Sequence, residues 1–308
     1  MKHSLKPIKH IKISKEMKTS ELVSRMKDAG FGARKLGISV DILEQAIQDK
    51  ECKVFLGLAG AMVPGGMREI IMDMLKNGWI DVLVSTGANL THDLIEALGF
   101  KHYIGSEKMN DAELHRKKLD RIYDVLMPNK VYVELEKFFV KNFDELAKAE
   151  SVREFLWNIG KIAPRESILG ICYEKKIPIF CPALTDSGIG LMVWSNIIRK
   201  KKIFLDEFKD LDEMIKLAWT KKKAVFYIGG GTPKNYIQQA MQFSQPASFG
   251  VQITTDRAEP GGSSGAPLCE GISWGKMNEK GKFIDVFCDA TIALPLIYSA
   301  LIDRIEKQ

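Results

Sequence analysis

Six short apolar runs, separated by helical patterns, restrict the fold of this chain more than any other feature. Each run is rich in β-branched and aromatic residues and has the length of a strand. Strands that alternate with helices form βαβ units, in which the strands run parallel. We therefore predict an α/β fold with a doubly wound, mainly parallel sheet. The predicted strands are 54–58, 81–85, 177–181, 224–228, 249–254 and 283–288.

Two regions outside this pattern are predicted to be helical. Residues 1–50 have the pattern of a helical arm, in which Thr19 and Ser20 cap one helix and a second helix covers 40–48. Residues 111–151 are charged and aromatic, and Pro128 and Asn129 interrupt them. Because no low-complexity linker occurs, we expect a single domain over 1–308, with a helical N-terminal extension and a helical insertion.

Composition excludes several classes of protein. Hydrophobic residues make up 45% of the chain and charged residues 27%, which excludes a disordered or collagen-like protein. No run of about 18 apolar residues occurs, and the basic N-terminus lacks the apolar core of a signal peptide, so we expect neither a membrane span nor export. The five cysteines are scattered singly without metal-binding spacing, which predicts reduced thiols, a cytoplasmic protein and no metal site.

The formal net charge of +6 suggests a nucleic-acid partner at first sight. The excess of lysine and arginine, however, lies at the chain ends and in the runs 199–202 and 221–223, beside apolar segments. The chain has no aromatic-interleaved basic stripe and no zinc finger. Solvated edges therefore explain the charge better than nucleic-acid binding, and an acidic protein partner stays open.

The loops that follow the predicted strands are the expected place for a ligand. In an open parallel sheet, ligands bind beyond the carboxyl ends of the strands. Glycine-rich loops lie there at 60–66, 86–88 and 229–231. Glycine lets backbone N–H groups approach a phosphate, although a tight turn also explains any single loop. Several such loops on one edge predict a dinucleotide site. The absence of a G-x-G-x-x-G or Walker A motif argues against a standard dehydrogenase or P-loop ATPase.

Charged residues near these loops allow more than one interpretation. Asp186 and Asp289 each follow a predicted strand, where a carboxylate can bind a ribose hydroxyl or cap the next helix. In the segment 270–276, the Trp274 face can attract an amine cation and the Glu270 carboxylate can hold it. A neutral Lys276 could then attack a C=N or C=O carbon. A surface turn is the alternative for this segment.

Ordered motifs along the chain resemble the deoxyhypusine synthase family. The resemblance runs over residues 26–305, in the order and at the spacing of that family. Such an ordered set is far more specific than any one motif. The motifs are GFGARKLG, AGAMVPGGMRE, DVLVSTGANLTHDLIE, PALTD, a triple glycine with a lysine three residues on, GISWGK and VFCDATIALPL.

The resemblance implies a Rossmann-like fold and a transferase that uses NAD. In the family's chemistry, NAD takes a hydride from spermidine and an enzyme lysine attacks the resulting imine, releasing 1,3-diaminopropane. The aminobutyl group then passes to an acceptor amine, and NADH reduces the new imine. The acceptor in the family's reaction is one lysine of the precursor of translation initiation factor 5A. The resemblance also implies a homotetramer with active sites at the subunit interfaces.

Position by position, the resemblance assigns roles to residues of this chain. It makes Lys276 the imine-forming lysine, places Trp274 against the amine chain, and places Glu270 in the substrate pocket. The expected dinucleotide contacts are Gly60, Thr86, Gly87, Asp186, Gly230, Gly231, Thr255, Asp289 and Ala290.

Three expected substrate-binding positions depart from the family pattern. Asn235 stands in place of a histidine, and Ser263 and Leu191 stand in place of aspartates. Each lost carboxylate removes about 1.5 to 3 kcal/mol of charge-assisted hydrogen bonding to an ammonium. His92 replaces the glutamate that the family often has in a cofactor loop, a change that the sequence does not explain.

Three readings of these departures stay open. The chain is a deoxyhypusine synthase in which Asp256, Glu259 or Asp93 supplies the lost contacts. Alternatively, it keeps the NAD and lysine chemistry with another polyamine donor or a small acceptor such as putrescine, which would give homospermidine. In the third reading it is an NAD-binding protein without transfer activity, but the presence of Lys276, Trp274 and Glu270 together argues against that.

Overall fold

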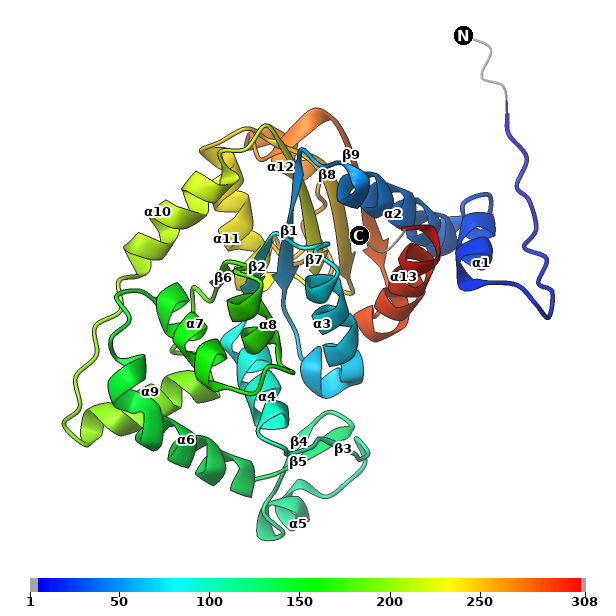
Figure 1. The fold of residues 1–308 in the computed structure, drawn as a ribbon. Coiled ribbons are helices and arrows are strands. Elements are labelled where there is room, and N and C mark those ends of the chain that lie inside the picture. The colour runs from blue at the N-terminus through cyan, green and yellow to red at the C-terminus, as the bar shows by residue number, and fades with distance from the viewer. Residues whose placement is uncertain (1–4, 306–308) are drawn as a thin grey trace.

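The computed structural model describes residues 5–305 and contains one six-stranded sheet in which every neighbouring pair of strands is parallel (Figure 1). Across the sheet the strands lie in the order β6-β2-β1-β7-β8-β9. Numbered along the chain, this is the order 3-2-1-4-5-6 of the Rossmann fold. The bounds are β1 Cys52–Leu58, β2 Val82–Ser85, β6 Ile179–Phe180, β7 Lys222–Ile228, β8 Ala247–Thr254 and β9 Met277–Phe287. The predicted fold class is confirmed, and each of the six predicted runs overlaps a strand of this sheet.

Side chains that alternate along the strands pack against helices on both faces of the sheet. Leu56 of β1 belongs to a large buried cluster together with residues of α2, α3, α4, α8 and α13. Phe55, one residue away, belongs to a second cluster with residues of α10 and α11. This period of two is what a strand buried on both faces requires. The helices are α2 Phe31–Gln48, α3 Arg68–Lys76, α4 Gly87–Ala97, α7 Val152–Ile162, α8 Ile168–Glu174, α9 Gly188–Ile198, α10 Glu207–Ala218, α11 Gly231–Gln242, α12 Glu270–Ser273 and α13 Ala290–Arg304, with a π-helical turn η1 at Val63–Met67.

The N-terminal arm differs from the prediction in its helix boundaries. Helix α1 covers Thr19–Met26, and Lys18 occupies its N-cap position without a side-chain hydrogen bond. Thr19 and Ser20 therefore lie inside the first turn and do not cap it, which corrects the sequence prediction. Helix α2 begins at Phe31, nine residues earlier than expected. Gly37 lies within α2, where it faces the end of α1. A Cβ at this position would come within 2.6 Å of the Lys27 side chain, so glycine permits α1 and α2 to cross closely.

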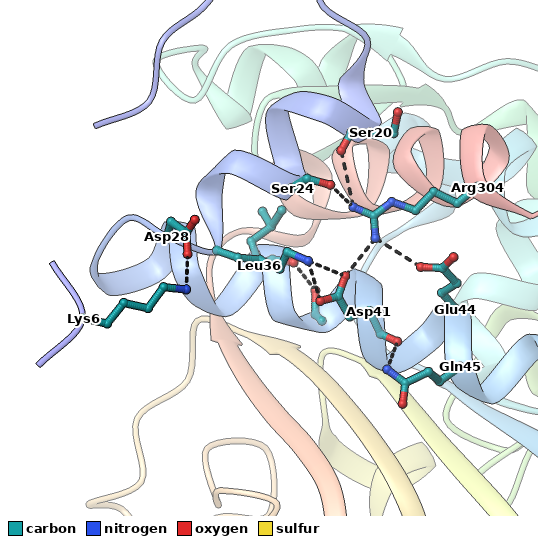
Figure 2. A network of polar contacts seen from close by, with 11 residues as sticks. Lys6, Ser20, Ser24, Asp28, Leu36, Asp41, Glu44, Gln45 and Arg304 are labelled. Carbon is teal, nitrogen blue, oxygen red and sulfur yellow. Dashed lines mark hydrogen bonds and ion pairs between the residues drawn. The ribbon is translucent and has the colours of Figure 1, made fainter. Parts of the chain in front are cut away.

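A polar network joins α1 and α2 to the C-terminal helix α13 (Figure 2). The Arg304 guanidinium donates to Asp41 at 2.9 Å, to Glu44 at 3.2 Å and to the Ser24 hydroxyl. Val23 of α1 is fully buried in the large cluster. The two helices of the arm are thus part of the packed core, whereas residues 5–16 are exposed.

The insertion between α4 and α7 is not purely helical, which corrects the second helical prediction. It contains a small antiparallel sheet of the strands β3 Tyr103–Ile104, β4 Leu119–Ile122 and β5 Val125–Pro128. Across this sheet the strands lie in the order β3-β5-β4. A two-residue turn joins β4 to β5, and its first residue, Tyr123, has a φ of 55°. Strands this short carry too few residues to display a period of two. The helices of this region are α5 Asp111–Arg116 and α6 Lys130–Leu146.

All five cysteines are free thiols. Within residues 5–305, no helix combines the length and the apolar character that crossing a bilayer requires.

Candidate functional site

A cavity of about 290 Å³ lies between α11, α12 and the loop 261–268. It brings together five of the residues that the sequence singled out for an amine substrate. They are Asn235, Ser263, Glu270, Trp274 and Lys276. These residues come from three separate stretches of the chain, so only the fold places them around one space.

Lys276 stands immediately before β9, at the amino end of that strand. Its backbone N–H donates to the Gly271 carbonyl at 2.8 Å, and Gly275 makes the turn with a φ of 67°. The Lys276 Nζ lies 4.8 Å from the centre of the Trp274 ring, within the range of a cation–π contact. The Trp274 side chain is 55% exposed in the single chain. An amine that enters the cavity therefore meets an aromatic face beside a nucleophilic nitrogen.

The cavity is elongated along one face of α11. Lys234, Asn235, Gln238 and Gln239 line it at helical spacing, and they span about 7.5 Å of helix axis at 1.5 Å per residue. The cavity extends from Ser263, near the glycine loop after β7, to Lys276 at the opposite edge of the sheet. An unbranched aliphatic amine matches this shape.

Lys234 is a buried member of the cavity wall that the sequence did not single out as a functional residue. Its ammonium donates to the carbonyls of Ser263 at 2.6 Å and Ala266 at 2.7 Å, which fixes the loop over the cavity. Burial lowers the pKa of Lys234 to about 8, opposed by the charges of Asp285 and Glu270. The only signal in the sequence was its place three residues after the triple glycine, because a lysine in a helix is ordinarily exposed.

The charges around the cavity are nearly balanced. Glu270 is the one carboxylate in the lining, against Lys234 and Lys276. Asp285 lies behind the wall, where its carboxylate accepts a hydrogen bond from the Leu268 N–H at 3.1 Å. Burial raises the pKa of Asp285, while that hydrogen bond and Lys234 oppose the shift. A trivalent cation would find little compensating charge in this chain alone.

The predicted cofactor loops converge at the carboxyl edge of the sheet. The Ala59 N–H donates to the Ile228 carbonyl at 2.9 Å, which joins the ends of β1 and β7. Asn89 is fully buried and donates to the Gly60 carbonyl at 2.8 Å and to the Thr86 hydroxyl at 3.2 Å. The loops after β1, β2 and β7 are therefore linked around the point where the strand order reverses, the usual binding crevice of this fold.

The glycines at this edge serve two different purposes. Gly66 and Gly231 have φ values of 83° and 55°, and a Cβ on either would meet nothing within 4 Å. Both positions border open space on the side where a Cβ would stand, although the Gly231 N–H itself donates to the Ser264 hydroxyl at 2.8 Å. At Gly230, in contrast, a Cβ would lie 2.3 Å from the Cα of Ser264. That glycine admits a neighbouring loop, so the tight packing of the chain explains part of the motif.

The remaining cofactor positions divide between helix ends and exposed loop positions. Asp289 caps α13 by accepting the Thr291 N–H at 2.8 Å, and Ala290 begins that helix. Asp186 does not cap α9, because the Ser187 hydroxyl accepts the Gly190 N–H at 3.1 Å instead. Asp186 and Thr255 are exposed. The glycine at 87 admits Ser187, whose Cβ would lie 2.5 Å from an added Cβ.

Four of the residues considered for the substrate, Leu191, Asp93, Asp256 and Glu259, lie outside the lining of the cavity. Leu191 is on α9, 54% exposed and outside the lining of the cavity. Asp93 is fully buried and pairs with Arg68 at 2.8 Å. Burial raises the pKa of Asp93, and Arg68 opposes the shift. Asp93 is therefore committed to a structural ion pair, which corrects the suggestion that it replaces a lost substrate contact.

Comparisons with known proteins agree with this architecture. The family model for deoxyhypusine synthase matches residues 21–301. The chain is 43% identical to "Probable deoxyhypusine synthase 1" of Methanosarcina acetivorans, over 98% of this chain and 96% of that protein. It is 42% identical to the protein of the same name from Archaeoglobus fulgidus, over 95% and 96% of the two chains.

More distant proteins share the fold. The chain is 37% identical to the "Deoxyhypusine synthase-like protein" of Chlorobaculum tepidum, over 94% of this chain and 88% of that protein. A chain named as a deoxyhypusine synthase from Entamoeba histolytica superposes with a TM-score of 0.66 at 19% identity, covering 96% of both chains. The protein AgrE, solved with ornithine and NAD+, gives a TM-score of 0.57 at 14% identity, over 92% of this chain and 35% of AgrE.

Proposed function

The chain belongs to the deoxyhypusine synthase family of transferases, and from this premise we propose that it transfers a 4-aminobutyl group from spermidine to an acceptor amine with NAD as cofactor. The acceptor we propose is a lysine of the translation initiation factor 5A precursor. One observation carries the proposal: Lys276, Trp274 and Glu270 line a single elongated cavity. That arrangement is what a lysine relay for an aliphatic amine needs.

The carboxyl edge of the sheet fits a dinucleotide. The glycine turns at Gly66 and Gly231, and the helix that begins at Gly87, would hold the phosphates. Gly60, Thr86, Gly230, Thr255 and Ala290 would line the same site. Asp186 and Asp289 would accept ribose hydroxyls. When bound, NAD supplies the acceptor for the hydride that leaves the amine carbon.

Lys276 performs the transfer in this proposal. Its neutral nitrogen adds to the carbon of the substrate imine, and the bond from that carbon to the departing nitrogen breaks, which releases 1,3-diaminopropane. The butylamine fragment then remains attached to Lys276 through a new imine. The acceptor amine adds to the same carbon and displaces the lysine. Trp274 and Glu270 hold the free ammonium end of the fragment during both exchanges.

A second candidate follows from the charge of the cavity. With Asn235 and Ser263 in the wall and Glu270 as its one carboxylate, the cavity in a single chain compensates one ammonium better than three. A diamine such as putrescine would then be donor or acceptor, with homospermidine as a product. Leu191 would contribute only if a second chain brings it to the cavity, as in the homotetramer that we also propose.

The free thiols are consistent with a cytoplasmic location.

The test is turnover with a panel of amines. The protein is incubated with NAD and spermidine, putrescine or cadaverine, with and without the factor 5A precursor. NADH fluorescence, released diamine and product mass are then measured. Borohydride added during turnover should fix a butylamine fragment on Lys276. Lys276→Arg should abolish the adduct and the transfer while it spares NAD binding. Transfer at a comparable rate in Lys276→Arg would exclude the lysine relay.

A further inference from the structure

Gln238 is a buried polar residue of the cavity wall that has no part in the lysine chemistry described above. It lies on α11, one turn beyond Lys234, and only 6% of its surface is exposed. Its side chain lines the cavity together with Gly271 and Lys276. A buried amide lowers stability unless its polar atoms are hydrogen-bonded, and a leucine of similar size would not have this cost. The partners of its nitrogen and its oxygen therefore bear on what the cavity binds.

Two neighbours fix the orientation of the Gln238 amide. Its nitrogen Nε2 lies 3.0 Å from the Tyr227 hydroxyl and 3.7 Å from the Met277 sulfur. A thioether sulfur can accept a hydrogen bond but cannot donate one, so the amide atom beside Met277 is the nitrogen. Both N–H groups of the amide are thus used within the protein. The carbonyl oxygen Oε1 lies on the other side of the amide.

The free oxygen of Gln238 is directed toward the part of the cavity beside Lys276. A Cβ placed on Gly271 would lie 3.3 Å from Gln238 Oε1 and 3.6 Å from the Lys276 Cβ. The backbone N–H groups of Gly271 and Lys276 already donate to the carbonyls of Leu268 and Gly271, at 3.0 and 2.8 Å. Within residues 5–305, no group donates to Oε1, and protein atoms do not enclose it. The cavity therefore has an unused hydrogen-bond acceptor near the base of the Lys276 side chain.

The position of this oxygen along the cavity matches the middle of a polyamine chain. At one end of the cavity, the Ser263 carbonyl is bound to α11 one turn before Gln238. At the other end lies Lys276, beside the aromatic face of Trp274. A polyamine whose butylamine end meets Trp274 and Glu270 therefore brings its internal nitrogen to Gln238.

We propose that Gln238 determines the specificity for the amine donor, because its Oε1 accepts a hydrogen bond from the internal N–H of a polyamine in the cavity. This inference rests on the proposed function, since it takes a polyamine as the ligand. It defines the donor as a linear amine with a secondary nitrogen within its chain. A diamine without an internal nitrogen cannot make this bond.

An amide oxygen suits the oxidation of an amine better than a carboxylate does. The hydride leaves the carbon beside the internal nitrogen only while the lone pair of that nitrogen is free, since this pair becomes the second bond of the imine. A carboxylate would favour the protonated nitrogen, whose lone pair is occupied. The neutral oxygen of Gln238 accepts the N–H of the uncharged amine, and this bond strengthens as the nitrogen becomes positively charged. The hydride passes to the dinucleotide of the proposed function, and Gln238 itself neither gains nor loses a proton.

The experiment compares two amines of equal length. Spermidine and 1,8-diaminooctane both carry two terminal ammonium groups, but 1,8-diaminooctane has a CH2 group in place of the internal N–H. Their dissociation constants are measured by titration calorimetry with NADH, which takes no further hydride, so that no turnover occurs. The unmodified chain should bind spermidine about tenfold more tightly, as expected for one hydrogen bond. Charge alone would give the opposite order, because Lys234 and Lys276 face only Glu270 in the lining.

Gln238→Leu should remove the preference for spermidine. Leucine has a similar size but no acceptor, so spermidine should bind about tenfold more weakly while the affinity for 1,8-diaminooctane changes by less than about twofold. With NAD in place of NADH, the formation of NADH from spermidine should slow by at least the same factor. The matched control is Gln242→Leu, which makes the same exchange at an exposed position of α11 outside the cavity lining. It should change the affinity for neither amine.

The outcomes separate the role of Gln238 from the proposed function. An equal preference for spermidine in the unmodified chain and in folded Gln238→Leu overturns the role of Gln238. If Gln238→Leu does not fold, the two amines on the unmodified chain decide, and equal or weaker binding of spermidine overturns that role. Release of 1,3-diaminopropane in either case leaves the proposed function intact. Failure of the unmodified chain to bind either amine overturns the proposed function, and the ligand of Gln238 with it.

Discussion

Replacing Lys234 by methionine should damage the cavity more than the fold. The substitution leaves the carbonyls of Ser263 and Ala266 without the ammonium that binds them at 2.6 and 2.7 Å. Each buried unsatisfied acceptor costs about 1 to 3 kcal/mol, and removal of a desolvated charge offsets part of this, so we expect a loss of about 2 to 4 kcal/mol. Because the loop 261–268 can open by itself, part of this loss should appear as local opening.

Lys223, on the strand β7 that precedes α11, provides a matched control. It is also fully buried, and its ammonium donates to the Ala218 carbonyl at 2.6 Å and to the Ser244 hydroxyl at 3.1 Å. Burial lowers its pKa to about 8, as for Lys234. It lies near the beginning of β7, away from the cavity lining. Lys223→Met should therefore reduce the free energy of unfolding without changing the amine KM.

Urea titrations, hydrogen exchange and amine KM together test whether Lys234 holds the loop 261–268 over the cavity. Lys234→Met should speed exchange in residues 261–268 and raise KM at least tenfold, since a loss of 2 kcal/mol in loop closure corresponds to more than one decade. Both lysines bind fewer protons when folded than when unfolded between pH 8 and 10.5, so the free energy of unfolding should rise with pH in that window. Each methionine variant should show a smaller rise. Unchanged exchange and KM in a folded Lys234→Met would refute the assignment of Lys234 to the loop.

Three further outcomes test other parts of the molecule. Arg304→Met removes the bonds to Asp41 and Glu44 and should lower the free energy of unfolding in urea by about 1 to 3 kcal/mol; no change would mean that the network is solvated. Asp289→Ala should weaken NAD by about 1 to 3 kcal/mol in calorimetry, and unchanged affinity in a folded variant would remove Asp289 from the site. Deletion of residues 1–16 should leave the melting temperature nearly unchanged, because residues 5–16 are exposed, and a large decrease would show that they support the core.

Five strands of the sheet, β6, β2, β1, β7 and β8, were predictable because they are buried on both faces. Runs such as Val54 to Leu58 are apolar throughout, and a run of that length between turn signals has few other uses. The order of the strands could not be read from the runs. It depends on which crossover packs against which face, and that is decided by contacts such as those of α2 and α13 with one face and α11 with the other.

The sequence prediction was wrong about the start of α2 and about the insertion, because tertiary contacts outweigh the local pattern in both places. The start of α2 at Phe31 includes Gly32 and Gly37, which locally disfavour a helix. Gly37 is nevertheless favourable there, because any side chain would strike α1. In the insertion, β3, β4 and β5 contain two to four residues each, so the hairpin depends on the turn at Tyr123 and on pairing across it.

In the candidate site, too, some functional residues can be predicted from their spacing in the sequence, whereas others depend on burial in the folded chain. Glu270, Trp274 and Lys276 lie within seven residues, so their chemistry was visible in the sequence. The surroundings of Lys234 and His92 could not be predicted, because each depends on a partner far along the chain or on a bend of the backbone. Lys234 binds carbonyls about thirty residues away, and His102 comes within 2.9 Å of His92 only because the chain turns back after α4. From the sequence alone, a lysine or a histidine on a helix surface is expected to be solvated. Burial removes the water, and hydrogen bonds within the protein then decide which atoms donate. The fold, and not the spacing of these residues in the sequence, therefore decides their surroundings.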